Sequence, residues 1–490
     1  MSGTKQKQDA HFRDKVPSPP QGRGRFKWYG PGLLWMLSAV GTGSILFTPR
    51  VASAYEYQLL WVLLVVVLFM WVMIREMARY SIVSGDTMLE GMHTLEGPRD
   101  WAVWIIFVPQ LFAAAIGIAG LAAVVGSALG EFLPGSNTAY AIGMVVFSTV
   151  FTATGRYSLI ETLSRLMALA LMVMAIVTAA IVFPAPQDVA QGLMPGWPDD
   201  PDLYIILPWV GTILAGSMGI VWFGYWTATR GFGGGLQKHK TGDQVPESSR
   251  KELEGTESAS LDKRLANAHG WIRIMSRTAA LGVVGGLVVI FSFLVLGSEL
   301  LAPEGIMPEG PEVAVDLTNI FSEVWGEFGR YLLLTAIVIA LGGSILANQD
   351  GWGRSFADMA LILTRSQRDA HDGGGALIKG LDALDRKLPW PLLERRWLKR
   401  LFIVTVTGLL PVIILLLFSD PVQVMSASGI IAAAHTPFIA LTALYVNRSR
   451  LPESLRPGMA ATVTMGLAGL FYLGFAVLYL LNMVGMFGGG

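Results

Sequence analysis

Long apolar runs alternate with short polar breaks along almost the whole chain. Eleven of these runs approach or exceed the length of about 20 residues that an α-helix needs to cross a bilayer. The pattern therefore predicts an all-α integral membrane protein with about eleven transmembrane helices. Their approximate limits are residues 31–55, 58–82, 101–133, 138–155, 160–183, 204–229, 272–301, 328–352, 399–418, 421–446 and 458–487.

The charges in the polar breaks separate by side of the membrane. If the N-terminus is cytoplasmic, the even-numbered connections carry the Lys and Arg clusters, whereas connections 184–202 and 299–327 carry mainly Asp and Glu. Cytoplasmic loops are the ones that carry an excess of Lys and Arg. We therefore expect a multi-pass plasma-membrane protein with a cytoplasmic N-terminus and, because the helix count is odd, an outside C-terminus.

The polar segments divide the chain into a tail and one membrane domain. Residues 1–27 are polar and basic and lack the apolar core of a signal peptide, which predicts a disordered basic cytoplasmic tail. Residues 28–490 form the expected transporter domain, with large cytoplasmic loops at 231–270 and 365–397. Both loops mix charges of either sign, as solvated linkers do.

Composition excludes several classes of protein. Of the 490 residues, 53% are hydrophobic and only 15% are charged, and the zero net charge gives no attraction to nucleic acid. Cys is absent, which excludes disulfides and thiolate metal ligands. No nucleotide-binding, zinc-binding or catalytic-triad pattern occurs, so we expect no enzyme and no cofactor. The expected partners are the lipid bilayer and a small solute or inorganic cation, and no feature fixes an oligomeric state.

The first apolar run is interrupted near its middle by glycines and hydroxyl residues, at positions 41–44. Inside a bilayer every backbone N–H and C=O needs a partner, so a broken helix is tolerated only where it lines a cavity or a substrate site. This interruption is therefore the first candidate for a functional site.

The same region carries a resemblance to a known family. The residues concerned are, in the first two helices, Gly30-Pro31-Gly32-Leu33-Leu34, Tyr57 and Leu59-Leu60-Trp61-Val62, and, as weaker matches in helices three, six and ten, Val125-Gly126-Ser127-Ala128, Gly211-Thr212 and Pro437-Phe438. They resemble the Nramp divalent-metal transporters. The resemblance implies two inverted five-helix repeats, about 28–183 and 204–446, plus one extra helix, with helices one and six both broken at the membrane centre.

The resemblance also implies where substrate binds, and the chain departs from the family there. Family members hold metal with an Asp-Pro-Gly-Asn break in helix one and a Met-Pro-His segment in helix six. Acidic residues in the third helix of proton-coupled members fall here on Ala113, Gly120 and Ala123. The corresponding substrate-binding positions in this chain are Gly41, Thr42, Gly43, Ser44, Thr212, Ala215, Gly216 and Ser217.

These departures change the expected cargo. A fully dehydrated divalent ion in a low-dielectric site needs an anionic ligand, and the thioether that favours transition metals is missing as well. Hydroxyls and carbonyls can hold an ion that keeps water, as Mg²⁺ does. The sequence therefore favours transport of a hydrated divalent cation such as Mg²⁺, without the family's usual proton relay.

Two alternatives stay open. The segment from Gly41 to Ser44 is also similar to the Gly-x-Gly break of amino-acid and polyamine transporters, where helix N–H groups bind a carboxylate. Arg50, near the outer end of helix one, would add to a field that favours anions. The other alternative is a solute receptor on the same scaffold that does not transport.

Four further polar residues are candidates for coupling or gating. His435 is the one histidine plainly inside an apolar run, and Gln110 lies within the third helix. Glu161 and Arg165 lie four residues apart at the start of helix five, where they can pair as a cytoplasmic gate. In helix eight, the same spacing suggests pairing among Asp350, Arg354 and Asp358.

Overall fold

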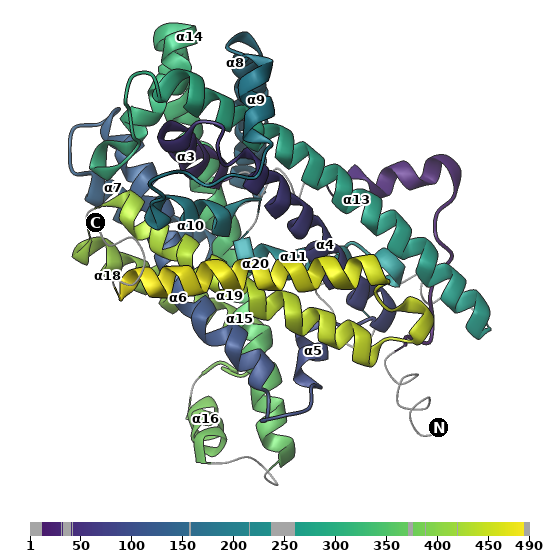
Figure 1. The fold of residues 1–490 in the computed structure, drawn as a ribbon. Coiled ribbons are helices and arrows are strands. Elements are labelled where there is room, and N and C mark those ends of the chain that lie inside the picture. The colour runs from purple at the N-terminus through teal and green to yellow at the C-terminus, as the bar shows by residue number, and fades with distance from the viewer. Residues whose placement is uncertain are drawn as a thin grey trace.

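A computed structural model describes residues 12–30, 32, 41, 43–155, 158–214, 216–236, 260–370, 376–387, 389–418 and 420–484. Every regular element in these residues is a helix, which confirms the expected all-α fold. The helices pack as a bundle, with α20 (Met459–Met483) crossing beside α19 (Pro421–Arg450) at its surface (Figure 1).

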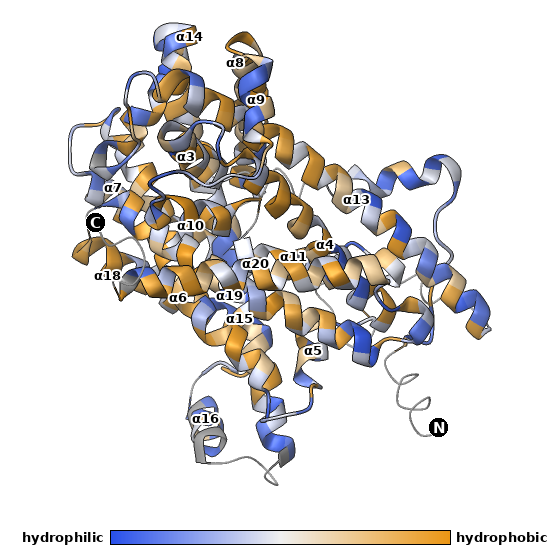
Figure 2. Cartoon of the chain, viewed as in Figure 1, coloured by the Kyte–Doolittle hydropathy of each residue, from blue (hydrophilic) through white to orange (hydrophobic). Residues whose placement is uncertain are grey.

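Nine helical segments within the described ranges are long and apolar enough to span a bilayer. Apolar residues cover most of their length, and polar residues gather at the ends and in the connections (Figure 2). The expected total of eleven stays a prediction. The nine segments are α4 (Leu60–Ser84), α6 (Trp101–Gly130), α8 (Ser158–Ile181), α10 (Leu203–Thr212) with α11 (Gly216–Thr229), α13 (Leu261–Leu296) with η4 (Gly297–Leu301), α14 (Val313–Ala336) with η6 (Ile337–Leu341) and α15 (Gly342–Ala370), α17 (Arg395–Val404) with η7 (Thr405–Leu409) and α18 (Leu410–Leu417), α19, and α20.

The remaining elements belong to helix one, to helix four and to the connections between helices. The outer part of helix one is the π-helical turn η2 (Gly43–Phe47) followed by α3 (Thr48–Tyr55), and α7 (Asn137–Thr154) is the fourth helix. The connecting elements are η1 (Gly22–Trp28), α5 (Met88–His93), α9 (Pro186–Gly192), η3 (Phe232–Gly234), η5 (Gly310–Glu312), α16 (Ala376–Lys387) and η8 (Glu453–Leu455).

Capping residues explain several helix ends. The side chain of Asp202 accepts a hydrogen bond from the Tyr204 N–H at 2.7 Å and starts α10. Asp420 caps α19 in the same way. Gly85 ends α4 with a left-handed φ of 71°, a conformation that glycine adopts without steric cost.

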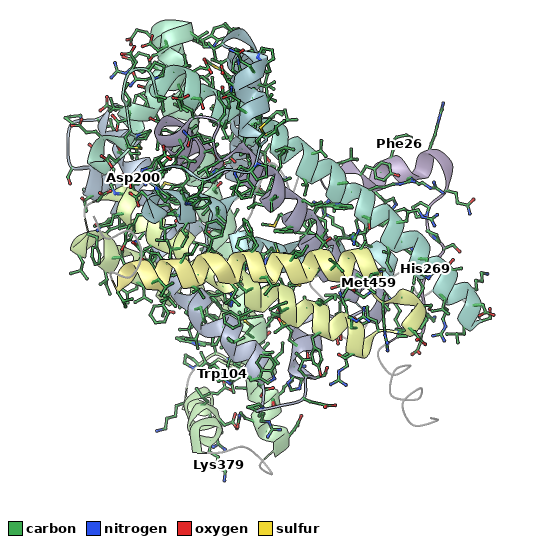
Figure 3. The ribbon with its side chains drawn as sticks, viewed as in Figure 1. Phe26, Trp104, Asp200, His269, Lys379 and Met459 are labelled. Atoms are coloured by element: carbon green, nitrogen blue, oxygen red, sulfur yellow. The ribbon has the colours of Figure 1, made fainter. Side chains whose placement is uncertain are left out.

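Two of the charged connections can be located in the structure. Asp200, in the acidic connection before α10, lies at the left of the view, and Lys379, on α16, lies at its lower edge (Figure 3). The side of the membrane on which each connection lies stays a prediction.

The described part of the N-terminal tail is packed against the bundle, whereas disorder was expected. The Asn267 amide donates to the Val16 carbonyl at 2.9 Å, and the Trp271 indole donates to the Pro17 carbonyl at 2.9 Å. The segment thus follows the polar N-terminal end of α13, where His269 also lies (Figures 1 and 3). The tail's carbonyls provide acceptors for α13 side chains, a contact that has no periodic signature in sequence.

Helices α10 and α19 cross at backbone contact. A Cβ on Gly211 would lie 2.0 Å from the carbonyl oxygen of Gly429. Only glycine fits such a crossing, so this pair holds helix six against helix ten beside the central break.

Replacing Gly211 with Ala should therefore destabilise the protein by about 3 kcal/mol, because the added methyl group overlaps a backbone atom that cannot move alone. The matched control is Gly143→Ala on α7, where a Cβ meets nothing within 4 Å. We expect the control to change stability by at most about 1 kcal/mol. Thermal unfolding in detergent measures both, and equal melting temperatures for the two variants would contradict the assignment.

Candidate substrate cavity

The sixth helix is broken between α10 and α11. Leu214 has φ of +65° and Gly216 has φ of +58°. A left-handed conformation is unusual for leucine and is retained where surrounding structure enforces it. The carbonyls that end α10 and the N–H groups that begin α11 therefore lack helical partners at the centre of the bundle.

The first helix is interrupted at the same level. Gly41 is not helical, and the helix continues from Gly43 as a π-helical turn. A Cβ on Gly43 would lie 2.3 Å from the Thr212 carbonyl oxygen, so the two breaks touch through their backbones. The Trp209 indole donates to the Thr48 hydroxyl at 3.1 Å, and that hydroxyl donates to the Gly43 carbonyl at 2.8 Å. These bonds tie the outer parts of helices one and six together.

The glycines of the breaks serve different purposes. Gly216 has the left-handed φ that favours glycine, and Gly43 permits the backbone contact between the two helices. Gly41 needs neither, because its φ is not positive and a Cβ there meets nothing within 4 Å.

A cavity of about 440 Å³ adjoins the two breaks. Ser44 is buried but is not one of the described residues that line it, and neither is His435. Thr42 and Ala215 lie outside the described residues. The predicted site residues that the cavity brings together are Gly41, Gly43, Gln110, Glu161, Arg165, Thr212, Gly216 and Ser217.

The described lining of the cavity includes five charged residues, Glu161, Arg165, Arg230, Asp350 and Arg354. Among the described lining residues, the only acids are Glu161 and Asp350, and each forms an ion pair with an arginine four residues later. Beside the breaks, the lining consists of glycines, hydroxyls, an amide and apolar side chains. No group of three or more His, Cys, Asp or Glu side chains within the described residues could hold a metal ion.

A buried polar network connects three helices at this neutral wall. The Gln110 amide nitrogen on α6 lies 2.8 Å from the Ser217 hydroxyl on α11 and 2.6 Å from Nδ1 of His435 on α19. The other ring nitrogen of His435 lies 3.0 Å from the Ile105 carbonyl oxygen. The sequence singled out these residues separately, and the structure joins them.

A second polar cluster borders the cavity on α15. The buried Asp350 carboxylate pairs with Arg354 and, at 2.5 Å, with Lys399 on α17. The expected pairing of Asp350 with Arg354 is present. Asp358 instead receives a two-pronged hydrogen bond from Arg395, at 2.6 and 3.0 Å.

Sequence reasoning missed part of the lining. Ala113, Gly117 and Leu121 follow Gln110 at helical spacing and line the cavity with it, so their shared face was a usable signal. Trp222 and Tyr225 on α11 also line the cavity, but their spacing is typical of ordinary helix packing. Only the three-dimensional structure shows that these two side chains line the cavity and are not ordinary core residues.

A multi-pass helical bundle in which two interrupted helices meet at a central cavity is the architecture of a secondary membrane transporter. The sequence model of the natural resistance-associated macrophage protein-like family, Nramp, matches residues 32–345. This match covers more than half of the chain, so the chain belongs to the Nramp family.

Comparisons with individual proteins agree on the fold. The chain is similar to crystal structures of the Eremococcus coleocola manganese transporter: a mutant form has TM-score 0.60 and 15% identity, covering 96% of this chain and 90% of that one. The same transporter in complex with an aromatic bis-isothiourea substituted compound has TM-score 0.59 and 16% identity, with coverage of 97% and 90%. An uncharacterized protein from Pasteurella multocida (strain Pm70) is 22% identical over 348 residues, 70% of this chain and 73% of its own length.

The two ion pairs of the wall should differ in their effect on stability. Asp350→Asn removes a buried carboxylate that pairs with Arg354 and Lys399, whose side chains are 45% and 27% exposed, and we expect a loss of about 2 kcal/mol. Glu161→Gln breaks a pair whose side chains are 41% and 43% exposed, so its cost should stay below about 1 kcal/mol. Thermal unfolding followed by tryptophan fluorescence compares them, and an equal loss in both variants would refute the distinction.

Proposed function

We propose that the protein transports a divalent metal cation that keeps much of its water shell, with Mg²⁺ favoured over transition metals. The observation that carries the proposal is the cavity between the two helix breaks, which presents neutral oxygen groups and no carboxylate beside the breaks. Membership of the Nramp family and similarity to a manganese transporter support a metal cation as cargo.

The energetics favour a hydrated ion. Stripping water from a divalent cation in a low-dielectric site costs more than neutral dipoles return, whereas an ion that keeps its water needs only hydrogen-bond acceptors around that water. Six water molecules occupy roughly 180 Å³ at the density of the liquid, which is less than half of the cavity. The site has room for an octahedral hydrated ion.

The same wall gives no ligand preference for transition metals. In the resemblance to the family, the soft thioether of helix six falls on Ala215 and the histidine falls on Ser217, which offers a hard oxygen. Ala113, at one of the family's acidic positions in helix three, lines the cavity without a titratable group. A proton relay at that position is therefore not part of the proposed mechanism.

A carboxylate substrate is the second candidate, and two observations favour it. Helix α11 begins at the break, and the first N–H groups of a helix have no acceptor within the helix and attract anions. Arg165, Arg230 and Arg354 also line the cavity. An amino acid or another small carboxylate would use both features.

Replacing Gly41 with Asp should decide between the two cargoes. The cavity side of Gly41 is open, so the carboxylate fits and supplies the missing anionic ligand. We expect Mg²⁺ affinity measured by calorimetry to rise at least about tenfold, and Mn²⁺ to bind the unaltered protein more weakly than Mg²⁺.

The matched control is Gly41→Asn, which adds the same shape without charge and should leave Mg²⁺ affinity nearly unchanged. Micromolar Mn²⁺ binding to the unaltered protein would refute the preference for Mg²⁺. Amino-acid binding that Gly41→Asp abolishes would favour the carboxylate candidate. If neither ligand responds in a folded Gly41→Asp protein, the site lies elsewhere.

Transport should proceed without proton uptake. Liposomes that contain the protein and a trapped pH dye should accumulate Mg²⁺ without acidifying, because the third helix lacks the family's acidic groups. His435→Ala tests the histidine that is buried among the described residues. Substrate-driven acidification that persists in His435→Ala would show a proton path that the proposed mechanism lacks.

A further inference from the structure

Pro109 determines the protonated nitrogen of a buried histidine. Pro109 lies inside α6 and has no N–H, so the carbonyl of Ile105, four residues earlier, loses its usual helical donor. Nε2 of His435 lies 3.0 Å from this carbonyl oxygen. A carbonyl oxygen can only accept, and the ring therefore carries its proton on Nε2.

The ring in turn orients the Gln110 amide. With Nε2 protonated, Nδ1 of a neutral ring is an acceptor, and the Gln110 nitrogen lies 2.6 Å from it. The second amide hydrogen goes to the Ser217 hydroxyl at 2.8 Å. The reversed amide would place its oxygen against the lone pair of Nδ1, so this reversal is disfavoured.

This orientation leaves one strong acceptor without a partner among the described residues. The Gln110 side-chain oxygen is fully buried and has no hydrogen-bond partner among the described residues, and Gln110 lines the cavity beside Ser217. Buried polar atoms without a partner are rare and indicate a missing ligand or water. Water molecules bound to a cation point their hydrogens away from it, so a hydrated cation needs hydrogen-bond acceptors around its water shell. A carboxylate substrate needs hydrogen-bond donors instead.

We infer that Gln110 is a specificity-determining residue whose amide oxygen accepts a hydrogen bond from the water shell of the bound cation. His435 is its positioning residue, and Pro109 sets the tautomer of His435. The inference rests on the proposed function, since the hydrated cation supplies the donor.

Two substitutions of His435 separate positioning from packing. His435→Asn keeps a polar group where Nδ1 lies and can still accept from Gln110, whereas His435→Gln places its amide near Nε2 and the Ile105 carbonyl. We expect His435→Asn to keep the Mg²⁺ dissociation constant within about threefold and His435→Gln to weaken it by about tenfold or more. Pro109→Ala returns a helical donor to Ile105 and should weaken binding by an intermediate factor.

Calorimetry on the full-length protein in detergent gives the dissociation constants, and thermal unfolding confirms that each variant is folded. Equal Mg²⁺ affinities for folded His435→Asn and His435→Gln would overturn the positioning role. Unchanged affinity in Gln110→Leu would overturn the contact with the cation's water.

The tautomer provides a readout that is independent of any ligand. In ¹⁵N-histidine-labelled protein, the His435 signals are those lost in His435→Asn, and we expect them to show protonation at Nε2. Protonation at Nδ1 overturns the inference whether or not Mg²⁺ binds. Protonation at Nε2 in a protein that binds no Mg²⁺ overturns the proposed function and the contact with it, while the orientation of Gln110 stands.

Discussion

The need to satisfy every backbone polar group inside a bilayer shapes this protein more than any single contact. At two prolines of the bundle, a side chain supplies the donor that the freed carbonyl needs. His435 donates to the Ile105 carbonyl that Pro109 leaves open, and the Gln349 amide donates at 2.7 Å to the Thr407 carbonyl, four residues before Pro411. These polar side chains serve as hydrogen-bond donors to the backbone. A buried polar atom without such a partner, such as the Gln110 side-chain oxygen, is a candidate for function.

The same requirement explains why the breaks meet. A broken helix exposes backbone groups, and these are tolerated beside a water-accessible cavity or against another backbone. Gly43 and Gly211 allow direct backbone contact with Thr212 and Gly429, so helices one, six and ten converge at one level. The cavity follows from this convergence, since Gly216 leaves space where α10 stops.

Hydropathy was enough to predict the all-α fold and the approximate positions of most of the long helices. The break in helix six, and the placing of Gly41, Thr212 and Ser217 at one cavity, were implied by the resemblance to the Nramp family and not by the apolar pattern. The sequence does not show which side chains of a broken helix face the cavity. Ser44 was therefore expected at the site, but it is not among the described residues that line the cavity. The link between Gln110 and His435 joins residues 325 positions apart, and no local pattern encodes it.

A neutral wall has a mechanistic consequence for the proposed transport cycle. A carboxylate in an empty cavity must be protonated or paired before the protein returns without cargo, because an unpaired buried charge is costly. Beside the breaks, the hydroxyls, carbonyls and the Gln110 amide carry no such charge, and the two carboxylates elsewhere in the described lining are paired with arginines, so the proposed return step needs no proton to compensate them. The cation's own gradient and the membrane potential then drive transport. For a divalent ion the potential contributes about 4.6 kcal/mol per 100 mV, which exceeds the free energy of a tenfold concentration gradient about threefold. Under the proposed function, the absence of the family's carboxylate also removes the need for its proton relay, because the described lining leaves no unpaired carboxylate in the empty site for a proton to neutralise.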